Sequence, residues 1–273
     1  MALFGKLFEK KVCSVCGGEI GLLGNRKLSD GNCCKRCAGK LSRWFEDRRE
    51  STAAQIKAQI AYRERNAEEL KSFGVSEVIG EYEKMYIEKV NGVPTRFFVA
   101  SESDYLDENP DIISLLDVLS CTADIDEYEE EIMREDKDGE MVSYSPPRYQ
   151  YRYNFYINMV IRDNPYFDTI RFNVNDNDVT LETVKGGSSL GGRNGSAGAP
   201  LRSAAANREA SRYDAYEQMC RKICQTVEDA KCGVKEQEAA EAEKKAARPA
   251  FCPACGAPAD GGQFCSFCGS RLG

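Results

Sequence analysis

The hydrophobic and polar positions change their period along the chain. Several segments between residues 75 and 184 alternate between apolar and polar side chains, which is the two-residue period of β-strands. Two apolar runs flank Asn91-Gly92, a dipeptide that favours a tight hairpin turn. The pattern predicts strands at residues 84–90, 94–100, 149–162, 169–174 and 179–184, with a short helix or strand at 111–120.

Two stretches show the helical period instead. Residues 46–72 are rich in helix formers, but only Ile56, Ile60 and Leu70 supply an apolar stripe. We therefore expect a connecting helix, with a coiled-coil contact to a second subunit as the alternative. Residues 208–231 predict a long helix with a fuller apolar face. That face consists of Tyr213, Tyr216, Cys220, Ile223, Cys224, Val227 and Ala230.

The segments between these elements set the domain boundaries. Residues 186–200 are mostly Gly, Ser and Ala and predict a flexible loop. The 273 residues leave room for about two domains. The sequence predicts an α+β multidomain protein: an N-terminal module at 1–45, a connecting helix at 46–74, a β-rich domain with a C-terminal helix at 75–232, a charged, Ala-rich linker at 233–250 and a C-terminal module at 251–273.

Eight of the thirteen cysteines form four Cys-x-x-Cys pairs, two pairs in each terminal module. Four thiolates at such spacings complete a tetrahedral zinc site. We therefore predict two structural zinc ions. The C-terminal module of 23 residues needs one, because so short a chain cannot fold on apolar burial alone. The predicted ligands are Cys13, Cys16, Cys34 and Cys37 in the first site and Cys252, Cys255, Cys265 and Cys268 in the second.

The first site has an ambiguous register, since Cys33 directly precedes Cys34. We prefer Cys34 as the ligand, because its two-residue spacing to Cys37 matches the other pairs. Cys33 is then a buried or neighbouring thiol. The residues that follow have helical spacing and are expected to pack over the site: Leu41, Trp44 and Phe45.

The other cysteines lie in the middle domain and its helix. We interpret them as packing residues, since free cysteine is among the most buried residue types. A third metal site is the alternative. The cysteines concerned are Cys121, Cys220, Cys224 and Cys232.

The chain contains no histidine. This excludes a Ser–His or Cys–His nucleophile pair, a histidine general base and a histidine metal ligand within the chain. The sequence predicts no catalytic and no cofactor-binding residue, so we expect a protein that is not an enzyme. A thiol redox function or a zinc-linked redox sensor is an alternative, because Cys-x-x-Cys is also the pair of dithiol oxidoreductases.

The sequence predicts neither a signal peptide nor a membrane span. The apolar start at residues 1–11 is short and lacks a small-residue cleavage site. No apolar run approaches the ~20 residues of a membrane helix. The expected location is the cytoplasm, where thiols stay reduced and paired cysteines serve metal or redox chemistry. Any membrane contact is expected to be peripheral.

The net charge of -7 is unevenly distributed. Residues 1–50 hold eleven Lys and Arg against six Asp and Glu, and the basic residues near Trp44 offer a possible nucleic-acid surface. Residues 101–140 hold sixteen Asp and Glu against two Lys and Arg, which would repel a phosphate backbone. We expect this acidic block to be a solvated face, with docking of a basic partner as the alternative.

The cysteine-bearing segments resemble known families. VCSVCGGEI at residues 12–20 and GNCCKRC at 31–37 resemble DUF4428, a family of bacterial domains of unknown function with the same double cysteine. CPACGAP at 252–258 and FCSFCG at 264–269 look like the C-terminal zinc ribbons of many bacterial proteins. The first resemblance implies zinc binding by Cys13, Cys16, Cys34 and Cys37.

The order of elements in residues 75–232, several strands followed by one long helix, is similar to that of pleckstrin-homology-like (PH-like) domains. That resemblance implies a bent antiparallel sheet closed by the helix. A sheet edge of such a domain can bind a peptide. We therefore expect an adaptor or scaffold that binds other proteins, with a nucleic-acid-associated protein as the alternative.

Overall fold

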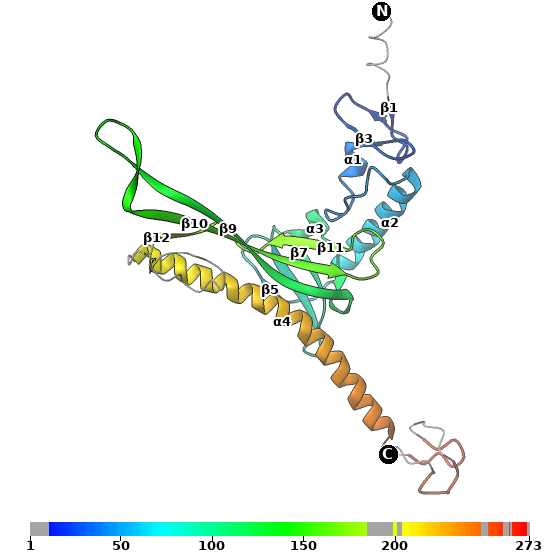
Figure 1. Cartoon of the computed structure of the whole chain (residues 1–273). Helices are drawn as coiled ribbons and strands as arrows, with labels where there is room; N and C mark the ends of the chain where they lie inside the picture. Colours follow the sequence, from blue (N-terminus) through cyan, green and yellow to red (C-terminus); the bar gives the residue numbers. More distant parts are fainter. Residues whose placement is uncertain are drawn as a thin grey trace, which may run out of the picture. The chain divides into compact units, whose positions relative to one another are not determined.

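The computed structural model describes residues 11–184, 199–200, 204–246, 251–258, 262 and 264–271. The chain forms two compact units, Met1–Val227 and Glu228–Gly273. Figure 1 shows the elements in chain order. The first unit contains a cysteine-rich module, two antiparallel sheets and the first part of a long helix, so the predicted α+β class is confirmed.

The cysteine-rich module is built from four very short strands and one helical turn. β1 (Lys11–Val12) pairs antiparallel with β2 (Glu19–Ile20), and β3 (Asn25–Lys27) pairs with β4 (Asn32–Cys34), which leads into α1 (Lys35–Ala38). Leu41 and Phe45 pack against the module core as expected, although α1 ends before them. Trp44, the third residue expected there, is not among the described residues that pack against this core. The buried residues of this core are Cys13, Ile20, Leu28, Cys33, Cys37 and Ile56.

The next helix, α2 (Ala53–Leu70), belongs partly to this module. Ile56 from its first turn is fully buried in the module core, so the core extends beyond the predicted boundary at residue 45. The predicted helix at 46–72 begins later, because Thr52 caps it. The Thr52 side chain accepts a hydrogen bond from the Gln55 backbone, and the Gln55 side chain accepts one from the Thr52 backbone.

The buried face of α2 is largely polar, which explains the thin apolar stripe in its sequence. Gln59, Arg63 and Asn66 are buried together with Ile56 and Leu70. At the far end of the helix, Leu70 packs in a second core with Phe73, Tyr86, Phe98 and Ala100. One helix therefore contributes to two cores of the first unit.

The first sheet has the order β5-β6-β7-β8 and is antiparallel throughout. The predicted hairpin is present: β6 and β7 meet at Asn91 and Gly92, whose φ angles are 53° and 81°. Between β7 and β8 lies α3 (Tyr105–Glu108), and the 3-10 helix η2 (Leu115–Asp117) follows β8. The strands are β5 (Val75–Ile79), β6 (Lys84–Val90), β7 (Val93–Ala100) and β8 (Ile113–Ser114).

The second sheet is organised around the 21-residue strand β10 (Met141–Ile161). β9 (Val118–Glu135) pairs along one edge of β10, while β11 (Thr169–Asn173) and β12 (Val179–Val184) share the other edge. The strands predicted at 149–162, 169–174 and 179–184 are therefore present. The acidic block at 126–140 was not predicted to be a strand, yet most of it lies in β9. Its carboxylates occupy exposed or half-buried positions, so the strand can form without alternating apolar and polar residues.

The last segment of the second sheet is β13 (Ala199–Pro200), which pairs with β12. Residues 186–198 of the predicted Gly-rich loop lie outside the described residues. Residues 199–200, at the end of that predicted loop, form β13. In the described part of the chain, β9 pairs only with β10.

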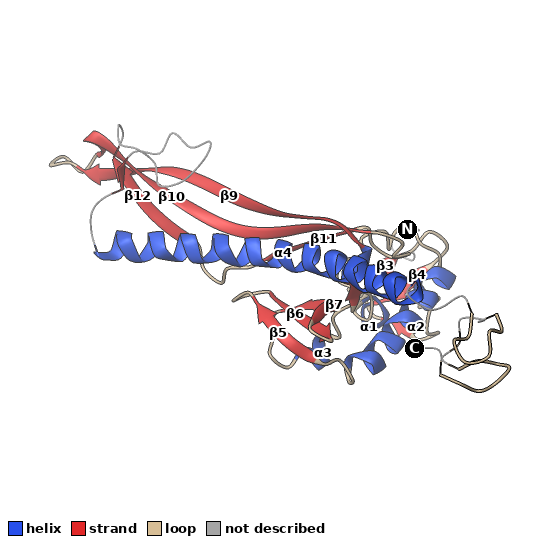
Figure 2. Ribbon diagram, turned by 90° about the horizontal axis from the view of Figure 1, so that it is seen from below, coloured by secondary structure: helices blue, strands red, loops and turns tan. Residues whose placement is uncertain are grey.

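The helix α4 (Ala204–Ala246) packs on the second sheet through its residues up to Val227. Figure 2 shows this part running along the long strands. The Tyr213 ring makes edge contacts with Tyr153 and Phe155, at centroid distances of 4.9 and 5.1 Å. Residues 233–246 of the predicted linker are helical, because Ala, Glu and Lys are strong helix formers.

The second unit carries the C-terminal module. Two isolated bridges, Phe251 to Pro258 and Phe264 to Arg271, close two small loops. Cys252 and Cys265 are buried and pack with Ala257. Among the described helices, none has the length and apolar character needed to cross a membrane.

Candidate metal centres

The first four-cysteine group begins with a tight turn after β1. Cys13 donates its backbone N–H to the Gly18 carbonyl, and Gly17 donates to the Cys13 carbonyl, both at 2.8 Å. Gly17 has a φ angle of 73°, a conformation that side-chain-bearing residues rarely adopt. The turn brings Cys13 and Cys16 to the same side of the loop.

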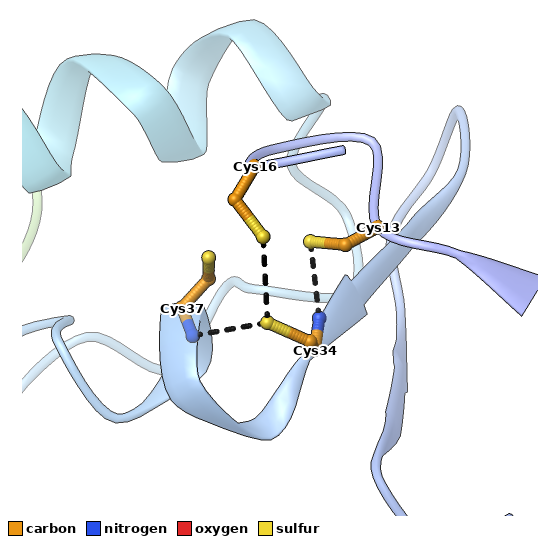
Figure 3. Close-up of side chains that lie close together, drawn as sticks. All are labelled: Cys13, Cys16, Cys34 and Cys37. Atoms are coloured by element: carbon orange, nitrogen blue, oxygen red, sulfur yellow. Dashed lines mark hydrogen bonds between the residues drawn. The ribbon is translucent and has the colours of Figure 1, made fainter. Parts of the chain in front are cut away.

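The second pair lies at the junction of β4 and α1. Cys34 is the N-cap of α1, and its sulfur accepts a hydrogen bond from the Cys37 backbone at 3.4 Å. The Cys34 backbone in turn donates to the Cys13 sulfur at 3.3 Å. Figure 3 shows the four side chains converging from the turn and from this junction. The Sγ atoms of Cys16 and Cys34 are 3.8 Å apart.

Cys33 lies outside this group. Its side chain is fully buried in the module core, and its sulfur donates to the Cys34 carbonyl at 3.5 Å. Burial, followed by the nearby Cys13 and Cys34, raises the pKa of the Cys33 thiol to about 11. The structure therefore brings Cys34 rather than Cys33 to the other three cysteines.

The C-terminal group uses the same turn twice. Cys252 donates its backbone N–H to the Ala257 carbonyl, and Cys265 donates to the Ser270 carbonyl, both at 2.8 Å. In each turn a glycine with positive φ follows the second cysteine. The sulfur atoms are 3.6 Å apart for Cys252 and Cys268, and 3.6 Å apart for Cys255 and Cys265.

Both groups have the dimensions of a tetrahedral zinc site. In each group the four sulfur atoms lie within 4.8 Å of one another. Zn–S bonds of about 2.3 Å in a tetrahedron place neighbouring sulfur atoms about 3.8 Å apart. The observed separations of 3.6 and 3.8 Å agree with that edge. Four soft sulfur ligands select zinc over the hard cations calcium and magnesium.

The first group also has the electrostatics of a site that needs a cation. Burial alone would raise the pKa of the Cys13 thiol. Backbone hydrogen bonds, first that of Cys16, outweigh burial and lower the pKa to about 6. Burial and then the neighbouring Cys34 raise the pKa of Cys37. Four thiolates therefore cannot form together without compensation, which a divalent cation provides.

In the second group, too, the pKa is lowered for one thiol and raised for another. Hydrogen bonds with the side chain and backbone of Ser270 lower the pKa of Cys268 to about 6. The Ala257 backbone lowers the pKa of Cys255, but the neighbouring thiols, first Cys268, raise it to about 12. A bound cation would remove this difference by charging all four sulfurs. Four protein ligands then leave no open coordination position, which is typical of a structural site.

Basic residues of the first module make internal contacts. The Arg43 guanidinium lies over the Trp44 ring, 4.0 Å from its centroid, and forms an ion pair with Glu83. Arg48 donates to the Lys27 carbonyl at 2.8 Å. The residues that offered an aromatic and basic nucleic-acid surface are therefore partly used within the chain.

The structure also brings together two cysteines that the sequence grouped only under the alternative of a third metal site. The sulfur atoms of Cys121 and Cys224 are 3.1 Å apart, although 103 positions separate them. Cys220 is buried as predicted, whereas Cys232 is exposed and the packing interpretation was wrong for it. No sequence spacing could have identified the pair of Cys121 and Cys224, because the two residues come from β9 and α4.

Comparison with known proteins finds one family model that matches part of the chain. Residues 11–59 match the model of a domain of unknown function, DUF4428. The match ends inside α2, in agreement with the contribution of Ile56 to the module core. No curated protein and no solved structure matches the chain. The resemblance of the N-terminal module to DUF4428 is thus confirmed, and that family carries no assigned activity.

Proposed function

We propose that this protein is a zinc-binding, non-enzymatic adaptor that binds other proteins. The observation that carries the proposal is the pair of four-cysteine groups, each with sulfur separations that fit a closed tetrahedral site. A closed site stabilises a fold and does not activate a substrate. Zinc would be held by Cys13, Cys16, Cys34 and Cys37, and by Cys252, Cys255, Cys265 and Cys268.

The free edge of β9 is the proposed partner surface. In the described part of the chain this 18-residue strand pairs only with β10, so its other edge offers backbone donors and acceptors for an added strand. Its exposed side chains include Glu127, Glu129 and Glu130. These charges discourage self-association of the edge and favour a basic partner.

The PH-like resemblance is part of the same proposal. Antiparallel strands followed by one packed helix support it, because this is the element order on which the resemblance rests. PH-like domains that bind peptides do so along a sheet edge, and β9 is such an edge.

The zinc part of the proposal is tested by metal analysis of the purified full-length protein. We expect two zinc ions per chain, retained after gel filtration. Two bound ions would also occupy all four Cys-x-x-Cys pairs and leave none for dithiol exchange. A protein that retains no zinc after purification with zinc present would contradict this part.

The adaptor part is tested by quantitative affinity purification with the full-length protein as bait. The comparison is between the natural sequence and a variant with Glu127→Lys, Glu129→Lys and Glu130→Lys. We expect specific proteins enriched by the natural bait to be lost with the variant. Equal enrichment by both baits would show that the edge of β9 is not the partner surface.

Nucleic-acid binding is the second candidate, favoured by the excess of basic residues in residues 1–50. Its test is a gel shift of the full-length protein with single-stranded RNA and DNA at ~50 and ~200 mM salt. A nucleic-acid-binding protein should lose affinity steeply with salt. Absence of a shift at both concentrations would leave the adaptor proposal alone.

A further inference from the structure

We propose that Cys121 and Cys224 form a site of reversible oxidation, at which a disulfide bond joins β9 to α4. Their sulfur atoms are 3.1 Å apart. This is shorter than the 3.6 and 3.8 Å between sulfur atoms in the four-cysteine groups. It exceeds the disulfide bond length of about 2.05 Å by about 1 Å, so the two sulfurs need only a small approach.

The two cysteines are held by elements that pack against each other. Cys121 lies near the start of β9, paired with Met159 of the central strand β10. Cys224 lies on α4 beside Ile223, which is fully buried. Both cysteines are half-buried, so a small oxidant can reach them while the surrounding core keeps them together.

The other two cysteines of α4, Cys220 and Cys232, differ from this pair in burial, so oxidation can be selective for the pair. Cys220 lies one helical turn before Cys224 and is fully buried. Burial, followed by the nearby Cys224, raises the pKa of the Cys220 thiol to about 12, so it stays protonated and unreactive at neutral pH. Cys232 is exposed, so it serves as a comparison for unselective oxidation.

Hydrogen peroxide is a sufficient oxidant for the reaction. The thiolate of one cysteine attacks a peroxide oxygen, the O–O bond breaks, and a sulfenic acid and hydroxide form. The thiol of the other cysteine then attacks the sulfenic sulfur, and the S–O bond breaks as the S–S bond forms. Water leaves with the thiol proton. In total two thiols lose two electrons and two protons, and one peroxide becomes two water molecules.

The bond would fasten α4 to the second sheet. Because the two residues are 103 positions apart, the disulfide would close a long loop and restrict the unfolded chain. In the folded protein it would oppose separation of α4 from β9. The site does not depend on the proposed adaptor function or on the zinc sites, since neither cysteine belongs to a four-cysteine group.

The test is peptide mapping of the zinc-loaded, full-length protein after treatment with hydrogen peroxide and blocking of free thiols with N-ethylmaleimide. Trypsin places Cys121 in the peptide 97–134, Cys224 in 223–231 and Cys220 in 213–221, with one cysteine each. We expect a disulfide between peptides 97–134 and 223–231 within one chain, which disappears on reduction with dithiothreitol.

Two controls keep the result specific. Cys232→Ser should leave the crosslink unchanged, and Cys224→Ser should abolish it without transferring it to 213–221. In the natural protein, amide hydrogen exchange in 223–231 should slow after oxidation, a readout that does not depend on how well a variant folds. The proposal is overturned if peptide 97–134 is crosslinked to peptide 213–221, or if the crosslink joins two chains. It is also overturned if Cys232 is oxidised while Cys121 and Cys224 both react with N-ethylmaleimide, because that reaction shows that they are still reduced.

Discussion

Arg63 and Asp111 form an ion pair in the interior of the first unit. The Arg63 guanidinium donates to a carboxylate oxygen of Asp111 at 2.7 Å, and the two side chains are only 7% and 1% exposed. Ser42 donates to the other carboxylate oxygen at 2.6 Å. Arg63 also donates to the Asn109 carbonyl. The contact joins α2 to the chain segment that leads into β8.

Replacement of Arg63 by methionine should destabilise the first unit strongly. The change leaves the Asp111 carboxylate buried without its cation, and loss of one partner of a buried pair typically costs about 3–5 kcal/mol. Urea unfolding followed by tryptophan fluorescence measures this change. The matched control is Lys71→Ala, which removes an exposed ion pair with Glu68 and should change stability by less than about 0.5 kcal/mol. Equal effects of the two variants would contradict the prediction.

Metal content should respond to single cysteine replacements. Cys16→Ser and Cys255→Ser should each lose about one of two zinc ions per chain, measured by mass spectrometry of the metal, because three sulfurs and a hydroxyl hold zinc less tightly than four sulfurs. Cys33→Ala is the matched control. It removes an adjacent thiol that lies outside the group and should retain both ions. Loss of zinc from the Cys33 variant would instead assign that thiol as a ligand.

The two zinc losses should affect stability differently. Cys16 lies in the first unit, whose module core includes Ile56 of α2, so Cys16→Ser should lower the unfolding transition of that unit. Cys255 lies in the second unit, so Cys255→Ser should leave that transition unchanged. The domain boundaries predicted from the sequence, with a connecting helix at 46–74, would instead leave the transition of the β-rich domain unchanged in both variants. Calorimetry of both variants distinguishes the two outcomes, since unchanged transitions in both would support those predicted boundaries.

Gly80→Ala should also destabilise the first unit. Gly80 has a φ angle of 122°, and an added Cβ would lie 2.5 Å from the Glu83 carbonyl oxygen. Backbone strain of this kind costs roughly 1–3 kcal/mol, and the contact adds to it. Gly21→Ala is the control, because nothing lies within 4 Å of its added Cβ. Denaturant midpoints that differ little between the variants would argue against this turn geometry.

Stability should fall at alkaline pH through Tyr216. Burial, followed by the hydrogen bond to Glu81, raises the pKa of Tyr216 from its ordinary 10.0 to about 12. The folded protein therefore keeps the phenol proton that the unfolded chain releases. This contribution is fully present below pH 10 and is lost as the pH rises toward 12. Unfolding free energies at pH 9, 10 and 11 should decline less steeply for Tyr216→Phe, and parallel slopes would show that Tyr216 plays no part.

The elements that the sequence predicted well depend on local patterns. The hairpin at Asn91 and Gly92 is present because two adjacent residues determine the turn. The cysteine turns likewise depend on short spacings and one glycine each. The acidic part of the strand β9 was missed because β9 is an edge strand with exposed carboxylates. Its side chains therefore do not alternate between apolar and polar. The pairing of Cys121 with Cys224 was missed because tertiary packing alone brings them together.

The helix α2 sets a fixed distance inside the first unit. Its first turn lies in the cysteine-rich core through Ile56, and its last residue, Leu70, lies in the core under the first sheet. At a rise of about 1.5 Å per residue, its 18 residues span about 27 Å. If the first four-cysteine group binds zinc as proposed, rearrangement of that group on zinc loss would tilt or rotate α2. The first sheet would then respond to the metal occupancy of a group that lies in another core.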